Sequence, residues 1–168
     1  MASVEHQQRV GVALGANCGD RLAQLERACD ALSDRFGALR LSRVYETEPV
    51  GCPPGSPPFL NACVEFYTAL PPQELLAVCQ EIERKLGRTR SGTYGEPRSC
   101  DIDIIYYGAC TQQSPQLTLP HPRAHLRRFV LAPLCDIDPT FTLPGQCRTV
   151  AELLDALPPL PAVRPFDL

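Results

Sequence analysis

The 168-residue sequence has no apolar run that approaches the roughly 20 residues a membrane-spanning helix needs. Residues 1–15 lack the long apolar segment of a secretory signal peptide. No charge of either sign dominates, because the formal net charge at pH 7 is only −3. These absences leave no electrostatic reason to expect a nucleic acid or an anionic membrane as a partner. We therefore expect a cytoplasmic protein that binds neither.

Cysteine is plentiful, but its pattern indicates neither a disulfide framework nor a zinc site. The nine cysteines are odd in number, and no pair has the spacing C-x-x-C. Several stand at apolar positions of predicted helices, as Cys29 and Cys79 do. We interpret these as small hydrophobic core residues, and a catalytic thiol remains an open alternative.

The remaining composition, 44% hydrophobic and 21% charged, is that of an ordinary globular protein, and we expect one domain over residues 1–168. Hydrophobic periodicity predicts strands over 9–15, 38–47, 59–70 and 100–107, with helices between Asp20 and Gly37 and between Pro72 and Gly87. This order, βαββαβ, is that of a ferredoxin-like fold. Further short helices are expected near 123–135 and from Thr149, where "TVAE" has the form of a capping box.

Two aspartates interrupt the apolar strand predicted over 100–107. Strand side chains alternate, so Asp101 and Asp103 should share one face, about 7 Å apart. Paired carboxylates repel each other, but they suit Mg²⁺, which takes a few carboxylates and completes its shell with water and phosphate oxygens. The polar loop 88–99 before the strand is rich in arginine, whose guanidinium group binds phosphate. An arginine-rich loop alone is usually a solvated turn, but together with the aspartates it indicates phosphate transfer.

The segment "GEPRSCDIDIIYYG", residues 95–108, resembles the P-R-x-x-D-[IL]-D-[IL] signature of the 6-hydroxymethyl-7,8-dihydropterin pyrophosphokinase family of folate biosynthesis. Further segments resemble the family in the same order along the chain. They are "VALGANCGDRLAQL", "YETEPVG", "FLNACVEF", "QEIERKLGR" and "LPHPRAHLRRFVLAPLCDIDP". Because the segments keep the family's order over nearly the whole chain, the sequence is identified as a member.

The resemblance implies an α+β fold with a ferredoxin-like βαββαβ core, in which a mainly antiparallel sheet carries helices on both faces. It implies an ATP-dependent diphosphotransferase that transfers pyrophosphate from ATP to the hydroxymethyl group of 6-hydroxymethyl-7,8-dihydropterin and releases AMP. Two Mg²⁺ ions are expected as cofactors, with ATP as co-substrate. The expected partners are ATP and the dihydropterin, and the protein is expected to be a monomer.

The resemblance also implies roles for individual residues. Asp101 and Asp103 match the Mg²⁺ ligands, and together with Arg88 and Arg98 they match the catalytic residues. The positions that match nucleotide contacts are Gln80, Glu83, Arg88, Arg90, Arg98, Thr118, His121 and Arg127. Those that match pterin contacts are Thr47, Val50, Phe59, Asn61 and Phe129, of which the two phenylalanines would sandwich the ring.

Each assignment has a plainer alternative. The two phenylalanines could be core residues, His121 a turn residue, and the polar residues of the second helix a solvated face. For the whole chain, one alternative is a Mg²⁺-dependent phosphate hydrolase, which would need no aromatic slot. Another is a ferredoxin-like RNA-binding module, although paired aspartates would repel phosphate. Formation of AMP that depends on added dihydropterin distinguishes all three.

Overall fold

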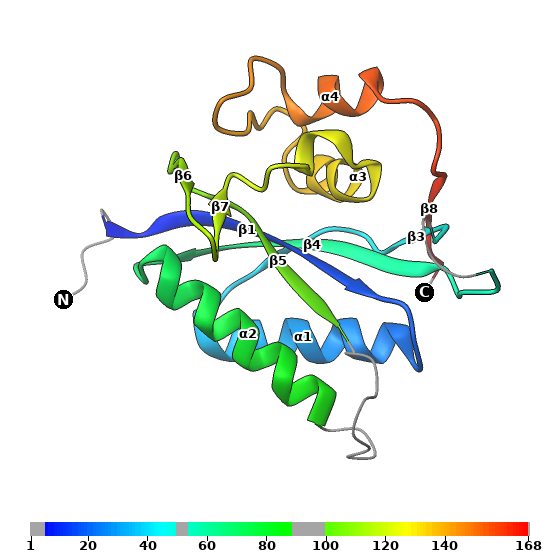
Figure 1. Cartoon of the computed structure of the whole chain (residues 1–168), viewed down its shortest axis with the longest axis horizontal. Helices are drawn as coiled ribbons and strands as arrows, with labels where there is room; N and C mark the ends of the chain where they lie inside the picture. Colours follow the sequence, from blue (N-terminus) through cyan, green and yellow to red (C-terminus); the bar gives the residue numbers. More distant parts are fainter. Residues whose placement is uncertain (1–5, 50–53, 89–99, 168) are drawn as a thin grey trace.

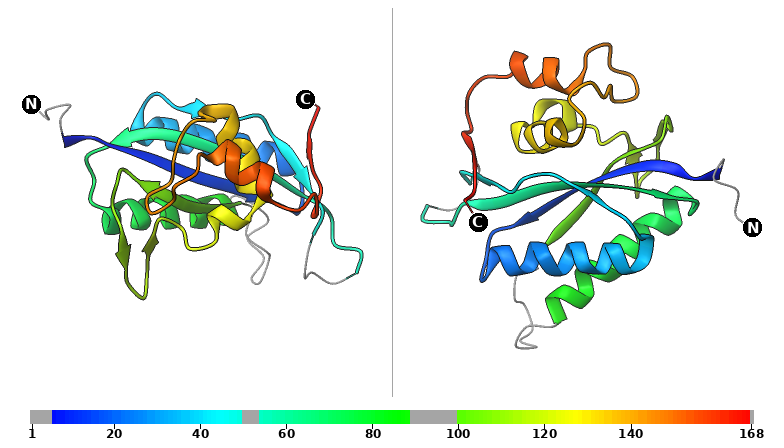
Figure 2. Two further views of the ribbon diagram at one scale, coloured as in Figure 1. Left: turned by 90° about the horizontal axis from the view of Figure 1, so that it is seen from above. Right: turned by 180° about the vertical axis from the view of Figure 1, so that it is seen from behind.

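The computed structural model describes residues 6–49, 54–88 and 100–167. One sheet lies between two helical layers (Figures 1 and 2). The helices α1 (Arg21–Phe36) and α2 (Pro72–Arg88) cover one face of the sheet. The helix α3 (Arg128–Ile137) packs on the other face and carries α4 (Val150–Ala156) on its outer side.

The sheet has the strand order of a ferredoxin-like fold. Its strands are β1 (Gln8–Ala16), β2 (Arg40–Leu41), β3 (Tyr45–Thr47), β4 (Phe59–Thr68), β5 (Asp101–Tyr107) and β8 (Val163–Pro165). They follow the order β5-β1-β4-β3-β8, β2 also pairs with β4, and all these pairs are antiparallel. A separate hairpin holds β6 (Gln112–Gln113) and β7 (Thr118–Leu119). The predicted α+β fold is confirmed.

The cap residues explain where two of the helices begin. The Asp20 side chain accepts a hydrogen bond from the Ala23 backbone N–H, so it caps α1 as predicted. Thr149 and Glu152 form the predicted capping box at the start of α4. At the end of α1, Gly37 adopts a φ of 85°, a left-handed conformation that glycine adopts without strain.

The prediction of one strand over 38–47 is wrong. Pairing with β4 passes from Leu41 opposite Val64 to Tyr45 opposite Asn61, so four steps along one strand match three along the other. At this irregularity the Ser42 hydroxyl accepts a hydrogen bond from the Cys63 N–H, and the Ser42 N–H donates to the Cys63 carbonyl. A side chain therefore replaces a backbone acceptor of the ladder, as in a β-bulge, and splits the strand in two.

The predicted helix near 123–135 is also divided. It consists of a 3₁₀ turn, η2 (Ala124–Leu126), and then α3. Arg127 separates the two because its backbone is extended, with φ −114° and ψ 110°. Among the described residues, no helix has the length and apolar character needed to cross a membrane.

The alternation of β1 creates the space in which the candidate site lies. Val10, Val12 and Leu14 point into the core beneath α1 and α2. The residues between them, which face α3, are small: Gly11, Ala13 and Gly15. Over residues 10–15, the strand β1 thus carries large side chains on the face toward α1 and α2 and only small ones on the face toward α3.

Candidate functional site

A cleft of about 440 Å³ lies on the α3 face of the sheet. Its volume lies in the range of small-molecule binding sites. The lining residues come from both the sheet and the α3 layer: Ala13, Leu14, Gly15, Thr47, Glu48, Phe59, Asn61, Asp101, Asp103, Ile105, Arg127, Phe129, Val130 and Pro161. Part of the floor is formed by the small residues Ala13 and Gly15 of β1.

Asn61 is the most constrained polar side chain in the cleft. It stands at the middle of the sheet, opposite Gly15 on one side and Tyr45 on the other. The Thr47 hydroxyl donates a hydrogen bond to Asn61 Oδ1 at 2.8 Å, and both residues are buried. A Cβ on Gly15 would lie 3.3 Å from Asn61 Nδ2, so the glycine leaves room for the amide. The side chain can offer a donor and an acceptor to the edge of a ligand.

Phe59 and Phe129 reach the same cleft from different layers. Phe59 begins β4, and Phe129 lies in the first turn of α3. Both rings are half-buried and line the cavity, so neither is a fully buried core residue. Apolar faces of this kind suit a flat heterocycle.

The two aspartates face the cleft from β5, an edge strand of the sheet. Both carboxylates are exposed, whereas Ile102 and Ile104 between and after them are buried in the core beneath α1 and α2. Further along, the pairing with β1 shifts and leaves Ile105 as an extra residue. This bulge comes after the aspartates, so their shared face, predicted from the alternation, is confirmed.

The negative charge of Asp103 is partly balanced within the cleft by Arg127. The surrounding protein displaces water and raises the pKa of the Asp103 carboxyl, while the Arg127 guanidinium lowers it. Arg127 also lies 5.4 Å from the centre of the Phe129 ring, in a cation–π arrangement. Its positive charge therefore interacts with both the carboxylate and the aromatic wall.

A divalent ion fits the two carboxylates, provided that other groups complete its shell. Among the residues described, no group of three or more histidine, cysteine or acidic side chains could hold a metal alone. Mg²⁺ commonly binds through one or two carboxylates plus the phosphates of its substrate. Asp101 and Asp103 are the hard oxygen donors that such an ion requires, and they open onto the cleft.

Four of the predicted nucleotide contacts do not line the cleft. Gln80 is exposed on α2, whereas Glu83 is buried there, which contradicts the alternative of a solvated face for Glu83. Thr118 lies in β7, and His121 follows it. Because α2 and β7 both contact β5, these residues flank the strand that carries the aspartates.

His121 is held by its backbone and by one ring nitrogen. Its N–H donates to the Ile105 carbonyl at 2.8 Å, and Nδ1 accepts from the Arg123 N–H at 3.1 Å. Burial lowers the pKa of His121, and Arg127 and Arg123 lower it further. These effects favour the neutral ring, and because Nδ1 accepts a hydrogen bond, the proton of the neutral ring belongs on Nε2.

Several predicted residues lie outside the described part of the chain. Val50, Arg90 and Arg98 are among them. Arg88 ends α2, but its side chain is also outside the described atoms. Conversely, the sequence did not indicate Glu48 or Pro161, which line the cleft. The small residues Ala13 and Gly15, which alternate with larger ones along β1, are a signal that could have predicted the open floor.

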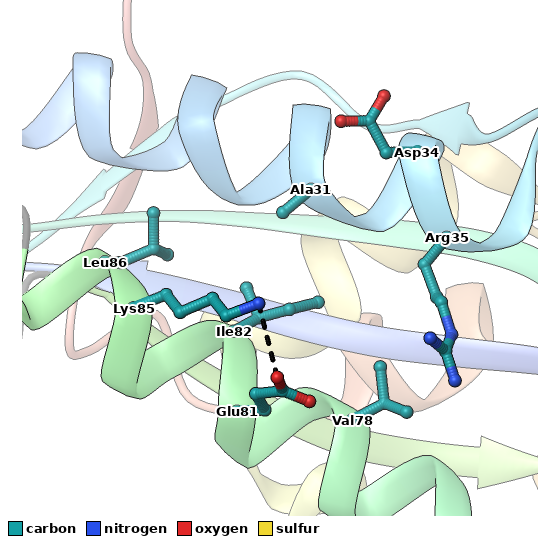
Figure 3. A pocket seen from close by; sticks show the side chains of 8 residues that line it. All are labelled: Ala31, Asp34, Arg35, Val78, Glu81, Ile82, Lys85 and Leu86. Carbon is teal, nitrogen blue, oxygen red and sulfur yellow. Dashed lines mark ion pairs between the residues drawn. The ribbon is translucent and has the colours of Figure 1, made fainter.

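A second cavity, of about 310 Å³, lies between α1 and α2 on the opposite face of the sheet (Figure 3). It mixes charged and apolar side chains, and Lys85 pairs with Glu81 along α2 at 3.2 Å. None of the residues predicted for substrate or metal lines this cavity.

Comparison with known proteins gives one consistent result. The family model of 7,8-dihydro-6-hydroxymethylpterin-pyrophosphokinase (HPPK) matches residues 11–139. The chain is 47% identical over 135 residues to the 2-amino-4-hydroxy-6-hydroxymethyldihydropteridine pyrophosphokinase of Porphyromonas gingivalis, covering 77% of this chain and 90% of that protein. It is 44% identical over 128 residues to the enzyme of that name from Bacillus subtilis, covering 75% of each.

The fold is similar to that of solved HPPK-DHPS structures from Plasmodium falciparum. One of them, in complex with SDX-DHP, superposes with a TM-score of 0.70 at 16% identity. The match covers 89% of this chain and 44% of that chain, so this chain spans less than half of that protein. At this identity the likeness concerns the fold alone.

Proposed function

This chain belongs to the 7,8-dihydro-6-hydroxymethylpterin-pyrophosphokinase family, and we propose that the cleft between the sheet and α3 is its active site. The protein is an ATP-dependent diphosphotransferase of folate biosynthesis. It transfers pyrophosphate from ATP to the hydroxymethyl group of 6-hydroxymethyl-7,8-dihydropterin and releases AMP.

One observation supports this assignment of the cleft above the others. A single cavity holds two half-buried aromatic rings, a buried amide and a pair of exposed carboxylates. A flat ring and a metal-bound phosphate chain could occupy it together, with their reacting atoms adjacent. A simple phosphate hydrolase would need the carboxylates but not the aromatic walls.

The residues around the floor and walls would bind the pterin. Phe59 and Phe129 present apolar faces to the ring, and each stacking contact is worth roughly 0.5–1.5 kcal/mol beyond the buried area. Asn61, oriented by Thr47, would recognise the polar edge. Val50 is proposed as a further pterin contact on the basis of the sequence resemblance.

The carboxylates would hold the metal and the cations would hold the phosphates. Asp101 and Asp103 are proposed ligands of two Mg²⁺ ions. The chemistry that Mg²⁺ supplies when bound is neutralisation of the triphosphate and a lower pKa of the attacking hydroxyl. Arg127 lies beside Asp103 and can bind a phosphate oxygen. The remaining proposed nucleotide contacts are Gln80, Glu83, Arg88, Arg90, Arg98, Thr118 and His121, of which Arg88 and Arg98 are also proposed as catalytic.

Catalysis by these residues is chiefly positioning. Phosphoryl-type transfer needs little covalent chemistry from the protein, so the gain comes from alignment and charge stabilisation. The stacked ring would fix the hydroxymethyl group near the carboxylate end of the cleft. A guanidinium group there would stabilise negative charge as AMP leaves.

The test is the dependence of AMP formation on each component. We expect AMP only when ATP, a divalent ion and dihydropterin are all present. Release of AMP or phosphate at the same rate without dihydropterin would favour a hydrolase. Absence of AMP under all conditions, with binding of RNA, would favour the nucleic-acid module. A monomeric state, a cytoplasmic location and a single domain over residues 1–168 stay predictions.

A further inference from the structure

We propose that the C-terminal strand β8 and the turn before it form a wall of the dihydropterin site, with Pro161 as a specificity-determining residue and Arg164 as a positioning residue. This inference rests on the proposed function of the cleft. The family match ends at residue 139, yet Pro161 lines the cleft together with Asn61 and Phe59. A segment beyond the matched region therefore contributes to the surface that meets the substrate.

The strand β8 is held directly against the strand that carries Thr47. It pairs antiparallel with β3, so that Val163 lies opposite Thr47 and Arg164 opposite Glu46 (Figures 1 and 2). One residue beyond the end of β8, the Phe166 N–H donates to the Val44 carbonyl at 2.8 Å. Thr47 orients Asn61, so β8 supports the side of the cleft where the polar edge of the pterin is expected.

Charged contacts fasten β8 to the cleft wall. The Arg164 guanidinium lies 3.3 Å from a Glu48 carboxylate oxygen and 3.8 Å from one of Glu46. Glu48 itself lines the cleft, so Arg164 both holds this side chain and offsets its negative charge. Loss of that cation would leave the negative charge of Glu48 unbalanced at a cavity that already contains two aspartates.

A second arginine connects this wall to the aromatic slot. Arg21 donates to the Glu46 carboxylate at 3.2 Å and to the Pro58 carbonyl at 2.7 Å. Pro58 directly precedes Phe59. The Arg21 guanidinium also lies 5.9 Å from the centre of the Phe166 ring. The C-terminal segment, β3 and the start of β4 are thus joined around one cation.

The position of β8 in the sheet predicts which substrate depends on it. The strand order places β8 at one edge and β5, with the proposed metal ligands, at the opposite edge. Changes in β8 should therefore affect the affinity for the pterin and leave the nucleotide almost unaffected. Pro161 contributes a rigid apolar surface, and loss of a few tens of Å² of apolar contact weakens binding by about fivefold.

The experiment compares variants of Pro161 and Arg164 with a matched control. We expect Pro161→Ala to raise the KM for dihydropterin about fivefold, with the KM for ATP unchanged within about twofold. Arg164→Ala should raise the pterin KM by a smaller factor, about twofold, and Arg164→Lys should restore it, because an exposed ion pair is weak. Arg148→Ala, an exposed arginine outside the cleft, should change neither constant.

A pterin KM that stays at the wild-type value in both Pro161→Ala and Arg164→Ala would overturn the inference. A parallel rise of both KM values would also overturn it, since it would indicate general disruption. Wild-type protein that forms no pterin-dependent AMP would instead contradict the proposed function itself.

Hydrogen exchange of the wild-type protein gives a second test that requires no variant. Amides of residues 160–167 should become more protected when dihydropterin is added to protein already saturated with a non-hydrolysable ATP analogue. Equal exchange before and after the addition would refute a role for β8 in the pterin site.

Discussion

At the scale of single residues, the hydrogen bond between Thr47 and Asn61 prepares the cleft before any ligand arrives. The bond joins two buried side chains on adjacent strands, so the amide of Asn61 is held in one orientation. A ligand that binds there does not have to order the side chain, which reduces the entropic cost of binding.

We predict that Asn61→Leu weakens dihydropterin binding by about 1–3 kcal/mol, the usual cost of leaving buried polar groups without partners. The affinity for an ATP analogue should change little, because β1 separates Asn61 from β5, the strand that carries the proposed metal ligands. Calorimetry on each ligand measures the two effects, and Thr47→Val, which removes only the orienting hydroxyl, should give a smaller loss of about 1 kcal/mol. Equal losses for both ligands would make Asn61 a structural residue.

The two aspartates should matter for turnover and hardly at all for the apo fold. The pKa of Asp103 is raised, so its charged form is disfavoured in the folded protein, and above the unfolded pKa that charge reduces stability. Asp103→Asn should therefore leave the thermal midpoint of the apo protein unchanged or slightly higher. Pyrophosphoryl transfer should fall by several powers of ten in Asp103→Asn and in Asp101→Asn, because a hard anionic ligand is lost.

The matched control is Asp34→Asn, an exposed acid on α1 at the opposite face of the sheet. It should alter neither turnover nor the thermal midpoint. Strong destabilisation of apo Asp103→Asn would mean that the carboxylate serves the architecture. Near-normal turnover in either cleft variant would end the metal hypothesis.

The residues that the sequence could predict are those whose role is encoded in a local motif. Asp101 and Asp103 are two positions apart in one strand, so alternation alone places them together. Pro161 has no such local signal, because it comes to line the same cleft as Asn61 only through the pairing of β8 with β3, far away in the sequence. Contacts across a sheet edge follow from tertiary structure and cannot be predicted from local patterns.

At the scale of elements, the pairing of β1 with β5 depends on a glycine and a bulge. After the bulge at Ile105, the ring of Tyr106 lies over Gly11, and its hydroxyl donates to the buried Glu65 carboxylate. Arg9 also donates to Glu65, at 2.7 Å, so the carboxylate is paired and hydrogen-bonded. A Cβ on Gly11 would come within 2.3 Å of the Tyr106 ring.

We therefore predict that Gly11→Ala lowers the free energy of unfolding by at least about 1–3 kcal/mol, the typical cost of overpacking. The backbone and the ring cannot both keep their places, and displacement of Tyr106 would remove a donor from buried Glu65. Chemical denaturation measures the loss. The control is Gly87→Ala in α2, where an added Cβ meets nothing within 4 Å, and a gain of about 0.5–1 kcal/mol is expected. An unchanged free energy of unfolding in Gly11→Ala would show that the sheet adjusts where β1 pairs with β5.

The strand predicted over 38–47 shows why element boundaries were harder to predict than element order. The sequence alternates throughout this range. At Ser42, however, the side-chain hydroxyl takes the place of a backbone acceptor, and the strand has one residue more than its partner β4 over the same stretch. A serine in a strand has no fixed preference for this role, so the pattern alone could not reveal the break. The order βαββαβ survived because it depends on long periodic segments.

At the scale of the whole molecule, the sheet separates two hydrophobic cores of different construction. The core beneath the sheet joins α1 and α2 directly to the strands, with Leu32 among its buried residues. The core above it joins α3 to the sheet and α4 to α3, with Leu134 among its buried residues. The cleft lies between the sheet and this upper layer, so binding should tie the two together.

We predict that the α3–α4 layer opens at a lower free energy than the layer of α1 and α2, because α4 is a short helix that packs on α3 rather than on the sheet. If so, Leu134→Ala should lower the opening free energy of α3 amides by about 2–5 kcal/mol, whereas Leu32→Ala should lower only that of α1 and β1. Native-state hydrogen exchange at low denaturant separates these openings.

Dihydropterin with an ATP analogue, at a hundred times its Kd, should raise the opening free energy of the α3 amides by about 2.7 kcal/mol, because the open state has lost half of the cleft. If Leu32→Ala lowered the α3 value as much as Leu134→Ala does, the two layers would open as one unit, and the cleft could not open without global unfolding.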